Sequence, residues 1–530
     1  MADLVHQLIT ESAQRVPERL ALKYREDQLN FKQLATAINA FAAGLMGLGL
    51  GRGDRVAIYA EKRLETVIAM FGASAAGGVY VPVNPLLKAE QVAYILADCN
   101  VRVLVTSPER LAVLAPALSL CPDLRCIVSM GDVPANVNLP GIQVVSWNSM
   151  QAATTATPTH QVIDQDVAAI LYTSGSTGRP KGVVLSHRNI IAGARSVAEY
   201  LELTENDRLL SVLPLSFDYG MNQLTTMFLV GGLAVLINHL FPRDIVTAVE
   251  KEKITGLAAV PPLWIQLSQL PWPTSITEHL RYFTNSGGHM PKETLAALRK
   301  ALPKTKPYLM YGLTEAFRST YLPPSEVDTR PDSMGKAIPN AEIVVVREDG
   351  TPCAPHEPGE LVHRGVLVSL GYWNDPEKTA ERFKPAPGQN PALPLTELAV
   401  WSGDTVKMDE EGFVYFVSRR DEMIKTSGYR VSPTEIEEVL YATKLVGEVA
   451  ALGISHPVLG QAIAIIATPA DGTVLTSASL LAECKRHLPT YMVPAHIEIA
   501  EGSLPRNPNG KIDRKLLATE RQQLFAGVTK

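Results

Sequence analysis

The chain has 530 residues, of which 46% are hydrophobic and 19% are charged, and its formal net charge is -5 at pH 7. A typical domain has roughly 100–200 residues, so this composition predicts a globular protein of more than one domain and excludes disorder for most of the chain. The weak negative charge and the lack of a Lys/Arg block argue against nucleic acid as a partner.

Cysteine usage and apolar patterning indicate a reducing compartment. The cysteines are odd in number and form no C-x-x-C pair, so no disulfide framework is expected; they are Cys99, Cys121, Cys126, Cys353 and Cys484. The first residues show no signal pattern, and the most apolar stretch, residues 227–237, is too short to span a bilayer. We therefore expect a cytoplasmic protein without a membrane span.

Helical and strand-like patterns alternate along the first part of the chain. Helices are predicted at residues 31–48, 63–76 and 90–97, and short buried strands at 56–59, 79–83 and 101–105. Alternation of this kind predicts parallel sheets with helices packed on their faces.

The pattern changes after about residue 335. Strand-like runs at 341–346, 359–363 and 412–417 are separated by turns rich in Gly and Pro, and a charged segment at 419–430 precedes a helix that starts at Pro433. We place a domain boundary between residues 420 and 421. Residues 1–420 would form an N-terminal core, and residues 421–530 a small α+β domain.

The most informative segment follows a predicted strand at 168–172. It reads Thr173-Ser-Gly-Ser-Thr-Gly-Arg-Pro-Lys181, and it combines backbone N–H groups, hydroxyl donors and one cation, as binding of a polyphosphate requires. It is not a Walker A loop, because Pro180 stands where that motif needs Gly. A flexible surface loop is the alternative for Gly and Ser alone, and the full string disfavours it.

This string and four later ones resemble, in order, the motifs of the AMP-forming adenylating superfamily, which includes acyl-CoA synthetases, nonribosomal-peptide adenylation domains and luciferase-like enzymes. The later strings are Tyr311-Gly-Leu-Thr-Glu315, Trp401-Ser-Gly-Asp404, Arg419 to Arg430, and Leu504 to Lys511. The resemblance implies an α/β fold. A large N-terminal domain would hold parallel-rich sheets sandwiched by helices and a small barrel-like β subdomain, next to a small mobile α+β C-terminal domain.

The resemblance also implies roles for individual residues. Lys511, Thr314 and Glu315 would be catalytic, Glu315 would hold Mg²⁺, and Asp421 would be the hinge between the domains. A single carboxylate suits Mg²⁺ that is also bound by phosphates, and an acceptor-only carboxylate suits ribose hydroxyls. ATP would be bound by Thr173, Ser174, Gly175, Ser176, Thr177, Gly178, Lys181, Gly287, Gly288, Tyr311, Asp404 and Arg419. For Arg419, a surface salt bridge remains the alternative to a ribose contact.

The segment from Leu213 to Leu224 corresponds to the part of the superfamily that faces the acid substrate. Its Phe-Asp-Tyr-Gly-Met-Asn-Gln-Leu string resembles that of free-standing prolyl-adenylating enzymes, in which the Asp pairs with the substrate ammonium group. A buried carboxylate needs a cationic partner, which fits this role for Asp218, whereas capping of the following turn is the structural alternative. The pocket candidates are Asp218, Tyr219, Asn222, Met310, Arg318 and Ser319.

Together these features predict a two-step ligase that uses ATP and Mg²⁺. A small amino acid, first of all L-proline, would form an aminoacyl-AMP and then pass to the phosphopantetheine thiol of a separate carrier protein. One alternative is an AMP-forming acyl-CoA ligase acting on a fatty or other small acid, with coenzyme A as acceptor and a structural role for Asp218. Another is a catalytically silent nucleotide-binding regulator, which the full set of Lys181, Glu315, Asp404 and Lys511 disfavours.

Overall fold

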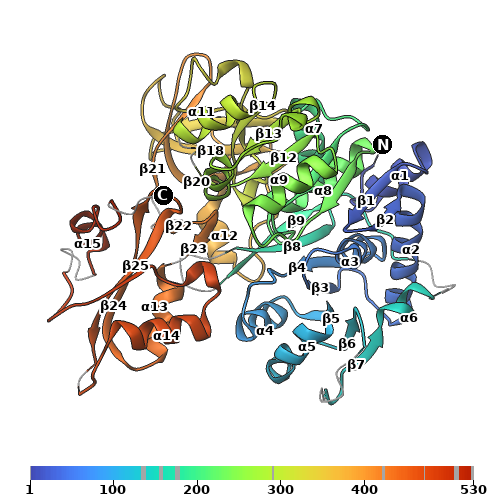
Figure 1. Cartoon of the computed structure of the whole chain (residues 1–530), viewed down its shortest axis with the longest axis horizontal. Coiled ribbons are helices and arrows are strands. Elements are labelled where there is room, and N and C mark those ends of the chain that lie inside the picture. The colour runs from blue at the N-terminus through green and yellow to red at the C-terminus, as the bar shows by residue number, and fades with distance from the viewer. Residues whose placement is uncertain are drawn as a thin grey trace.

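The computed structural model describes residues 2–132, 139–153, 159–173, 180–288, 290, 292–419, 424–431, 433–470, 472–505 and 512–526. A large body contains two extended sheets, and a smaller body with its own sheet lies beside it (Figure 1). None of the helices within these ranges is long and apolar enough to cross a membrane.

The first sheet carries the predicted phosphate-binding segment. Its strands run in the order β7-β6-β5-β3-β4-β8-β9 and are parallel except for the antiparallel pair β8–β9. Their bounds are β3 Arg55–Tyr59, β4 Val79–Pro82, β5 Val101–Thr106, β6 Cys126–Ser129, β7 Gln143–Ser146, β8 Val167–Thr173 and β9 Lys181–Ser186. The helices α4 (Ala89–Asp98), α5 (Pro108–Leu114) and η1 (Ala115–Leu120) belong to a core on one of its faces.

The second sheet is parallel in its middle and antiparallel towards one end. Its order is β17-β18-β20-β21-β16-β15-β14-β13-β12-β10-β11-β1-β2, with β19 paired to β20. The parallel strands are β10 Arg208–Ser211, β11 Leu233–Leu236, β12 Gly256–Ala259, β13 Tyr282–Asn285 and β14 Lys306–Tyr311, joined by β1 Leu20–Tyr24 and its hairpin partner β2 Asp27–Asn30. The antiparallel strands form the predicted β subdomain: β15 Thr320–Leu322, β16 Ser333–Ala337, β17 Ala341–Val346, β18 Gly359–Gly365, β19 Phe383–Pro385, β20 Leu398–Met408 and β21 Val414–Arg419.

A layer of buried helices joins these two sheets. In α3 (Leu64–Ala75) and α8 (Asp218–Val230) nearly every residue is buried, as expected for helices that are covered on all sides. Phe71 of α3 packs edge-on against Phe228 of α8, with 5.2 Å between ring centroids. The helices α1 (Gln7–Arg15), α2 (Phe31–Gly47) and α7 (His187–Tyr200) add residues to the same core.

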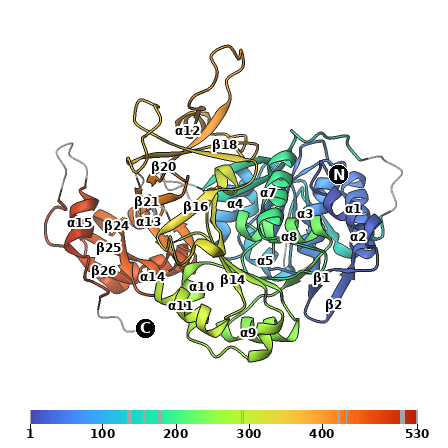
Figure 2. The same ribbon diagram turned by 90° about the horizontal axis from the view of Figure 1, so that it is seen from above.

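The remaining helices of the large body cover outer faces or connect strands. They are α6 Trp147–Gln151, α9 Pro242–Lys251, α10 Pro261–Ser268, η2 Thr274–Glu278, α11 Lys292–Ala301, η3 Thr314–Ala316, η4 Pro324–Glu326 and α12 Pro376–Arg382. The view from above places α9, α10 and α11 together on one side of the second sheet (Figure 2).

The small body is an α+β unit. Its sheet has the order β23-β22-β25-β24, with β26 paired to β25, and helices cover both faces. The helices α13 (Pro433–Ala442) and α14 (Ser477–His487) cover one face, and α15 (Arg514–Glu520) covers the other, which lies farther from the large body (Figure 1). The other elements are β22 Ile424–Thr426, β23 Tyr429–Val431, β24 Val446–His456, β25 Gly460–Pro469, η5 Thr490–Met492 and β26 His496–Ile499.

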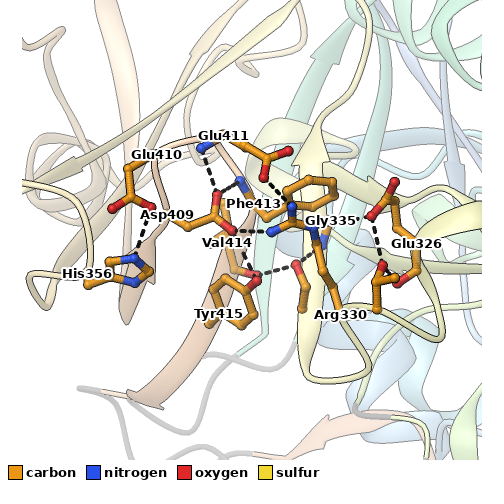
Figure 3. A network of polar contacts seen from close by, with 12 residues as sticks. Glu326, Arg330, Gly335, His356, Asp409, Glu410, Glu411, Phe413, Val414 and Tyr415 are labelled. Atoms are coloured by element: carbon orange, nitrogen blue, oxygen red, sulfur yellow. Dashed lines mark hydrogen bonds and ion pairs between the residues drawn. The ribbon is translucent and has the colours of Figure 1, made fainter.

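One arginine fastens the turn that joins β20 to β21. Arg330 donates to Asp409 at 2.7 Å and to Glu326 at 3.2 Å, contacts Glu411, and lies 4.0 Å above the Phe413 ring (Figure 3). These contacts hold the start of β21, which ends at Arg419, two residues before the predicted hinge Asp421.

The sequence predicted this class of fold correctly. Each helix and strand predicted from the alternating pattern is present, with ends that differ by a few residues at most. The predicted α/β class with parallel-rich sheets, helical layers and a small α+β unit is confirmed. The exact boundary between residues 420 and 421 lies outside the described residues and stays a prediction.

Candidate active site

The predicted phosphate-binding loop joins two paired strands. Thr173, at the end of β8, is the cross-strand neighbour of Lys181, at the start of β9. The intervening candidates Ser174, Gly175, Ser176, Thr177 and Gly178 lie outside the described residues. The strand before the loop is braced by Tyr172, whose hydroxyl donates to Asp98 Oδ2 at 2.5 Å.

Lys181 and Glu315 both lie next to the side chain of Tyr372. The Lys181 ammonium lies 5.1 Å from the centre of the Tyr372 ring, and the Tyr372 hydroxyl donates to Glu315 Oε1 at 2.7 Å. Burial lowers the pKa of Lys181, and the nearby Lys378 acts in the same direction, while Asp375 and Glu315 oppose it. The predicted cation and the predicted metal ligand therefore share one local environment.

The predicted ribose-binding residues also come together. Asp404 on β20 is the cross-strand neighbour of Arg419 on β21, and its carboxylate accepts a hydrogen bond from the Tyr311 hydroxyl at 2.5 Å. Tyr311 is the last residue of β14, so strands from both parts of the second sheet build this corner. The Arg419 side chain lies outside the described part of the structure.

Asp218, a predicted acid-binding residue, lies beside the predicted catalytic residue Thr314. It is the first residue of α8, and its side chain is buried. Its Oδ1 accepts a hydrogen bond of 3.3 Å from Thr314, the predicted catalytic threonine. Burial raises the pKa of Asp218, and the charge of Arg318 opposes that rise. The carboxylate thus sits in a place that favours its neutral form unless a cation is close.

A strained turn places Arg318 beside Asp218. Phe317 has φ 57° and ψ -47°, and the Arg318 N–H donates to the Ala316 carbonyl at 2.6 Å. This is a γ-turn of the rare positive-φ form, which costs on the order of 1–3 kcal/mol. Arg318 is 2% exposed, and its guanidinium carbon lies 4.7 Å from the centre of the Tyr219 ring.

The other pocket candidates are buried, and each contacts a neighbouring side chain. The Tyr219 hydroxyl lies 2.5 Å from Thr284 Oγ1, and Met310 Sδ accepts a hydrogen bond from Tyr200. Ser319 Oγ lies 3.0 Å from Nδ1 of His363, whose pKa burial lowers to about 4, so that imidazole is neutral. Met310 and Ser319 are thus held by neighbouring side chains.

Three further candidates lie on α8 and just after β13. Asn222 follows Asp218 by one helical turn on α8, is 3% exposed and donates weakly to Thr225. Gly287 and Gly288 follow β13, and the Gly288 carbonyl accepts a hydrogen bond of 3.0 Å from Asn285.

The small body approaches the site through its β22–β23 turn. A Cβ added to Gly428, which has φ +81°, would lie 2.7 Å from Cγ2 of Val260 in the large body. The next residue, Tyr429, stacks on Tyr491 at 3.8 Å and meets Phe217, the residue before Asp218, at 6.1 Å between ring centroids. Lys511 and Asp421, the predicted catalytic lysine and hinge, lie outside the described residues.

Sequence reasoning missed residues that support the motifs from a distance. Tyr372 lies 57 positions after Glu315, and Asp98 lies 74 positions before Tyr172. Neither belongs to the strings that carry the resemblance. The local signal at Tyr372 is its place just before the charged segment 375–384, and that segment does not by itself indicate a partner.

Comparison with known proteins agrees with this geometry. Residues 9–373 match the family model "AMP-binding enzyme", and residues 435–511 match "AMP-binding enzyme C-terminal domain". The chain is 29% identical to an L-proline–[L-prolyl-carrier protein] ligase of Pseudomonas fluorescens, over 98% of this chain and 99% of that protein. It is 31% identical to a long-chain-fatty-acid–CoA ligase of Salmonella typhimurium, over 97% and 94% of the two chains.

Solved structures extend the agreement to the fold. A double mutant of the o-succinylbenzoate–CoA synthetase of Bacillus subtilis superposes with a TM-score of 0.82 at 25% identity, covering 96% of this chain and 97% of that one. The two bodies therefore have the fold of a known enzyme class. The chain belongs to the AMP-binding enzyme family of the AMP-forming adenylating superfamily, and it activates a carboxylic acid with ATP.

Proposed function

We propose that this enzyme activates a small amino acid as an aminoacyl-AMP and transfers it to the thiol of a separate carrier protein. The observation that carries the proposal is the buried carboxylate of Asp218, which lies within hydrogen-bond reach of Thr314. Burial raises the pKa of this carboxylate against the opposing charge of Arg318, and the ammonium group of an amino acid would supply a further cation that favours the anion. L-Proline is the first candidate, because a relative of similar length is named for it.

In the first step, a carboxylate oxygen of the acid attacks the α-phosphorus of ATP and pyrophosphate leaves. Lys181, with its neighbour Thr173, would stabilise negative charge on the phosphates, and Asp404 would accept hydrogen bonds from the ribose hydroxyls. Lys511 would bring a further positive charge to the reacting oxygens. This is the electrostatic stabilisation that phosphoryl chemistry requires.

The residues around Glu315 fit a Mg²⁺ ion that arrives with ATP. Tyr372 donates to Oε1 of Glu315, so the hydrogen bond orients the carboxylate. Within the described ranges, no group of three or more His, Cys, Asp or Glu side chains could hold a metal ion. The single carboxylate of Glu315 suits Mg²⁺, which is usually held by one or two carboxylates together with phosphates and water. When bound, the ion would neutralise phosphate charge.

In the second step, a thiol sulfur attacks the acyl carbon, AMP leaves, and the thiol proton passes to solvent. The Gly428 turn lies against Val260, and the next residue, Tyr429, meets Phe217, the residue before Asp218, whereas α15 covers the face of the small body that lies farther from the large body (Figure 1). We assign this arrangement to thioester formation. Rotation about Asp421 would bring Lys511 in for adenylate formation.

A second candidate function is an AMP-forming ligase that passes a fatty or other small acid to coenzyme A. The observation that favours it is Arg318, whose charge acts on Asp218 and could serve as its permanent counter-ion. Relatives named as long-chain-fatty-acid–CoA ligases have comparable identity. In this case Asp218 would be structural, as the first residue of α8.

ATP–pyrophosphate exchange with a panel of amino acids and fatty acids separates the two functions. In the amino-acid ligase, Asp218→Asn raises the KM of the amino acid roughly tenfold to a hundredfold, since a hydrogen bond to a charged group is lost, and leaves the KM of ATP unchanged. Asp207→Asn, at a buried carboxylate paired with Arg281, is the matched control and leaves both KM values unchanged. Exchange with fatty acids alone, or an unaltered amino-acid KM in Asp218→Asn, would contradict the proposal.

The pH dependence gives an independent check. Burial raises the pKa of Asp218, so the fraction ionised falls as the pH drops towards that raised pKa. The wild-type KM of the amino acid therefore rises towards acid pH, and Asp218→Asn loses this dependence. A pH profile that is the same in both proteins would assign the titration to another group.

A further inference from the structure

Arg318 is a buried cation whose hydrogen-bonding capacity is largely unused. Its side chain is 2% exposed, and neither Nε nor Nη2 has a hydrogen-bond partner in the part of the chain that the structure describes. Arginine stays protonated at every accessible pH, so burial cannot remove this charge. Within the described residues its charge acts on Asp218 and on the Tyr219 ring, so once Asp218 pairs with a substrate ammonium group the buried N–H groups of Arg318 need a partner that arrives from outside.

The position of this guanidinium is fixed by its surroundings. The γ-turn at Phe317 directs the chain into Arg318, and the Phe317 ring is buried against Gly193 of α7. The Arg318 guanidinium then stacks on Tyr219, which follows Asp218 on α8 and is itself held by Thr284. A strained turn and a buried stack of this kind are typical of a group that is held ready for a ligand.

Charge balance in the pocket indicates the nature of the ligand. Once a neutral-side-chain amino acid has become an adenylate, its reacting carboxylate has lost its charge and only the ammonium charge remains in the pocket. Asp218 balances that ammonium charge and leaves Arg318 uncompensated. A second carboxylate on the substrate would balance Arg318. The Asp218 carboxylate would then pair with the substrate ammonium group, and the Arg318 guanidinium with the second carboxylate. Water could satisfy the N–H groups of Arg318 but could not neutralise its charge.

We propose that Arg318 binds a side-chain carboxylate of the substrate, so that the enzyme selects an α-amino dicarboxylic acid whose ammonium group is held by Asp218. This inference rests on the proposed amino-acid ligase function and moves its preferred substrate from proline to a dicarboxylic amino acid. The planar guanidinium, with Nε and Nη2 on one edge, matches the two oxygens of a carboxylate.

The test compares acids that differ only in this charge. ATP–pyrophosphate exchange is measured with the full-length enzyme on L-aspartate, L-glutamate and L-2-aminoadipate, on L-asparagine and L-glutamine as uncharged isosteres, and on L-proline and fatty acids. The wild type is expected to prefer one dicarboxylic amino acid over its amide. Arg318→Met should reduce that preference roughly tenfold to a hundredfold, mainly through KM, because a charge-assisted hydrogen bond is lost.

Matched variants separate recognition from folding. Arg281→Met removes another arginine that stacks on a tyrosine, with 4.9 Å to the Tyr282 ring, but is paired with Asp207, so it should leave the preference unchanged. Arg318→Lys keeps the charge without the planar edge and should retain part of the preference. If Arg318→Met does not fold, the comparison is made on the wild type alone. Its melting temperature should then rise more with the dicarboxylic acid than with the corresponding amide.

The outcomes are distinct. Exchange with proline or other neutral amino acids, and with no dicarboxylic one, would overturn this inference and leave the amino-acid ligase function standing. Exchange with fatty acids alone would overturn both, and would make Arg318 the internal counter-ion of Asp218. A preference for the dicarboxylic acid that survives Arg318→Met unchanged would show that another group binds the second carboxylate.

Discussion

The substitution Gly193→Ala in α7 tests whether packing of this helix against the Phe317 turn is essential to the site. A Cβ added at this position would lie 2.2 Å from Cδ1 and 2.4 Å from Cε1 of Phe317, whose side chain is fully buried. Neither ring atom is the end of a flexible chain, so the ring must shift. Because Phe317 lies between Glu315 and Arg318, a shift of its ring disturbs both.

Two effects of Gly193→Ala oppose each other. Replacing Gly by Ala inside a helix stabilises it by about 1 kcal/mol, and overpacking a tight core costs about 1–3 kcal/mol. A contact as short as 2.2 Å against a fully buried ring places the cost in the upper part of that range. We expect a net loss of about 1–2 kcal/mol in the free energy of unfolding.

Gly47→Ala is the matched control, because Gly47 is also helical and a Cβ there has nothing within 4 Å. Urea unfolding and ATP–pyrophosphate exchange are measured for both variants. Gly47→Ala should be as stable as the wild type or more stable, with unchanged kinetics. Gly193→Ala should unfold earlier and show a higher KM for the acid. If both variants behave alike in stability and kinetics, the reasoning about the Phe317 turn is wrong.

Two further predictions concern the phosphate side. Lys511→Ala should abolish adenylate formation but spare thioester formation from a supplied acyl-adenylate; equal loss in both half-reactions would refute the separate role of this lysine. Tyr372→Phe removes the hydroxyl that donates to Glu315 at 2.7 Å, so it should weaken Mn²⁺ binding in the presence of ATP, measured by electron paramagnetic resonance, by roughly tenfold or more. Unchanged Mn²⁺ affinity would show that this hydrogen bond does not orient the carboxylate.

The sequence indicates which residues are candidates for the site, whereas the contacts among them come only from the structure. Motif strings such as Tyr311 to Glu315 are local, and the strands and turns around them follow from local patterns of apolar residues, Gly and Pro. The hydrogen bond from Thr314 to Asp218 joins residues 96 positions apart, and the bond from Tyr372 to Glu315 joins residues 57 positions apart. Pairings of this kind depend on how sheets and helices meet, which local periodicity does not determine.

The positive φ of Phe317 is another feature that the local sequence does not predict. A bulky aromatic residue disfavours that backbone region, so the sequence gives no reason to expect a turn there. Burial of the Phe317 ring offsets the strain of the turn. The ring fits because α7 has Gly193 at this contact, 124 positions earlier in the chain, where any side chain would collide with the ring.

The short segment from Thr314 to Arg318 leads us to expect that recognition of the acid and chemistry at the phosphates are coupled. Thr314 contacts Asp218 on the acid side, Glu315 accepts from Tyr372 on the phosphate side, and Arg318 returns to the acid side over Tyr219. A turn that holds all of these cannot adjust one of them alone, because close-packed interiors respond as a unit. An acid that fails to fill the Asp218 and Arg318 positions should therefore lower the rate of adenylate formation as well as the affinity for the acid.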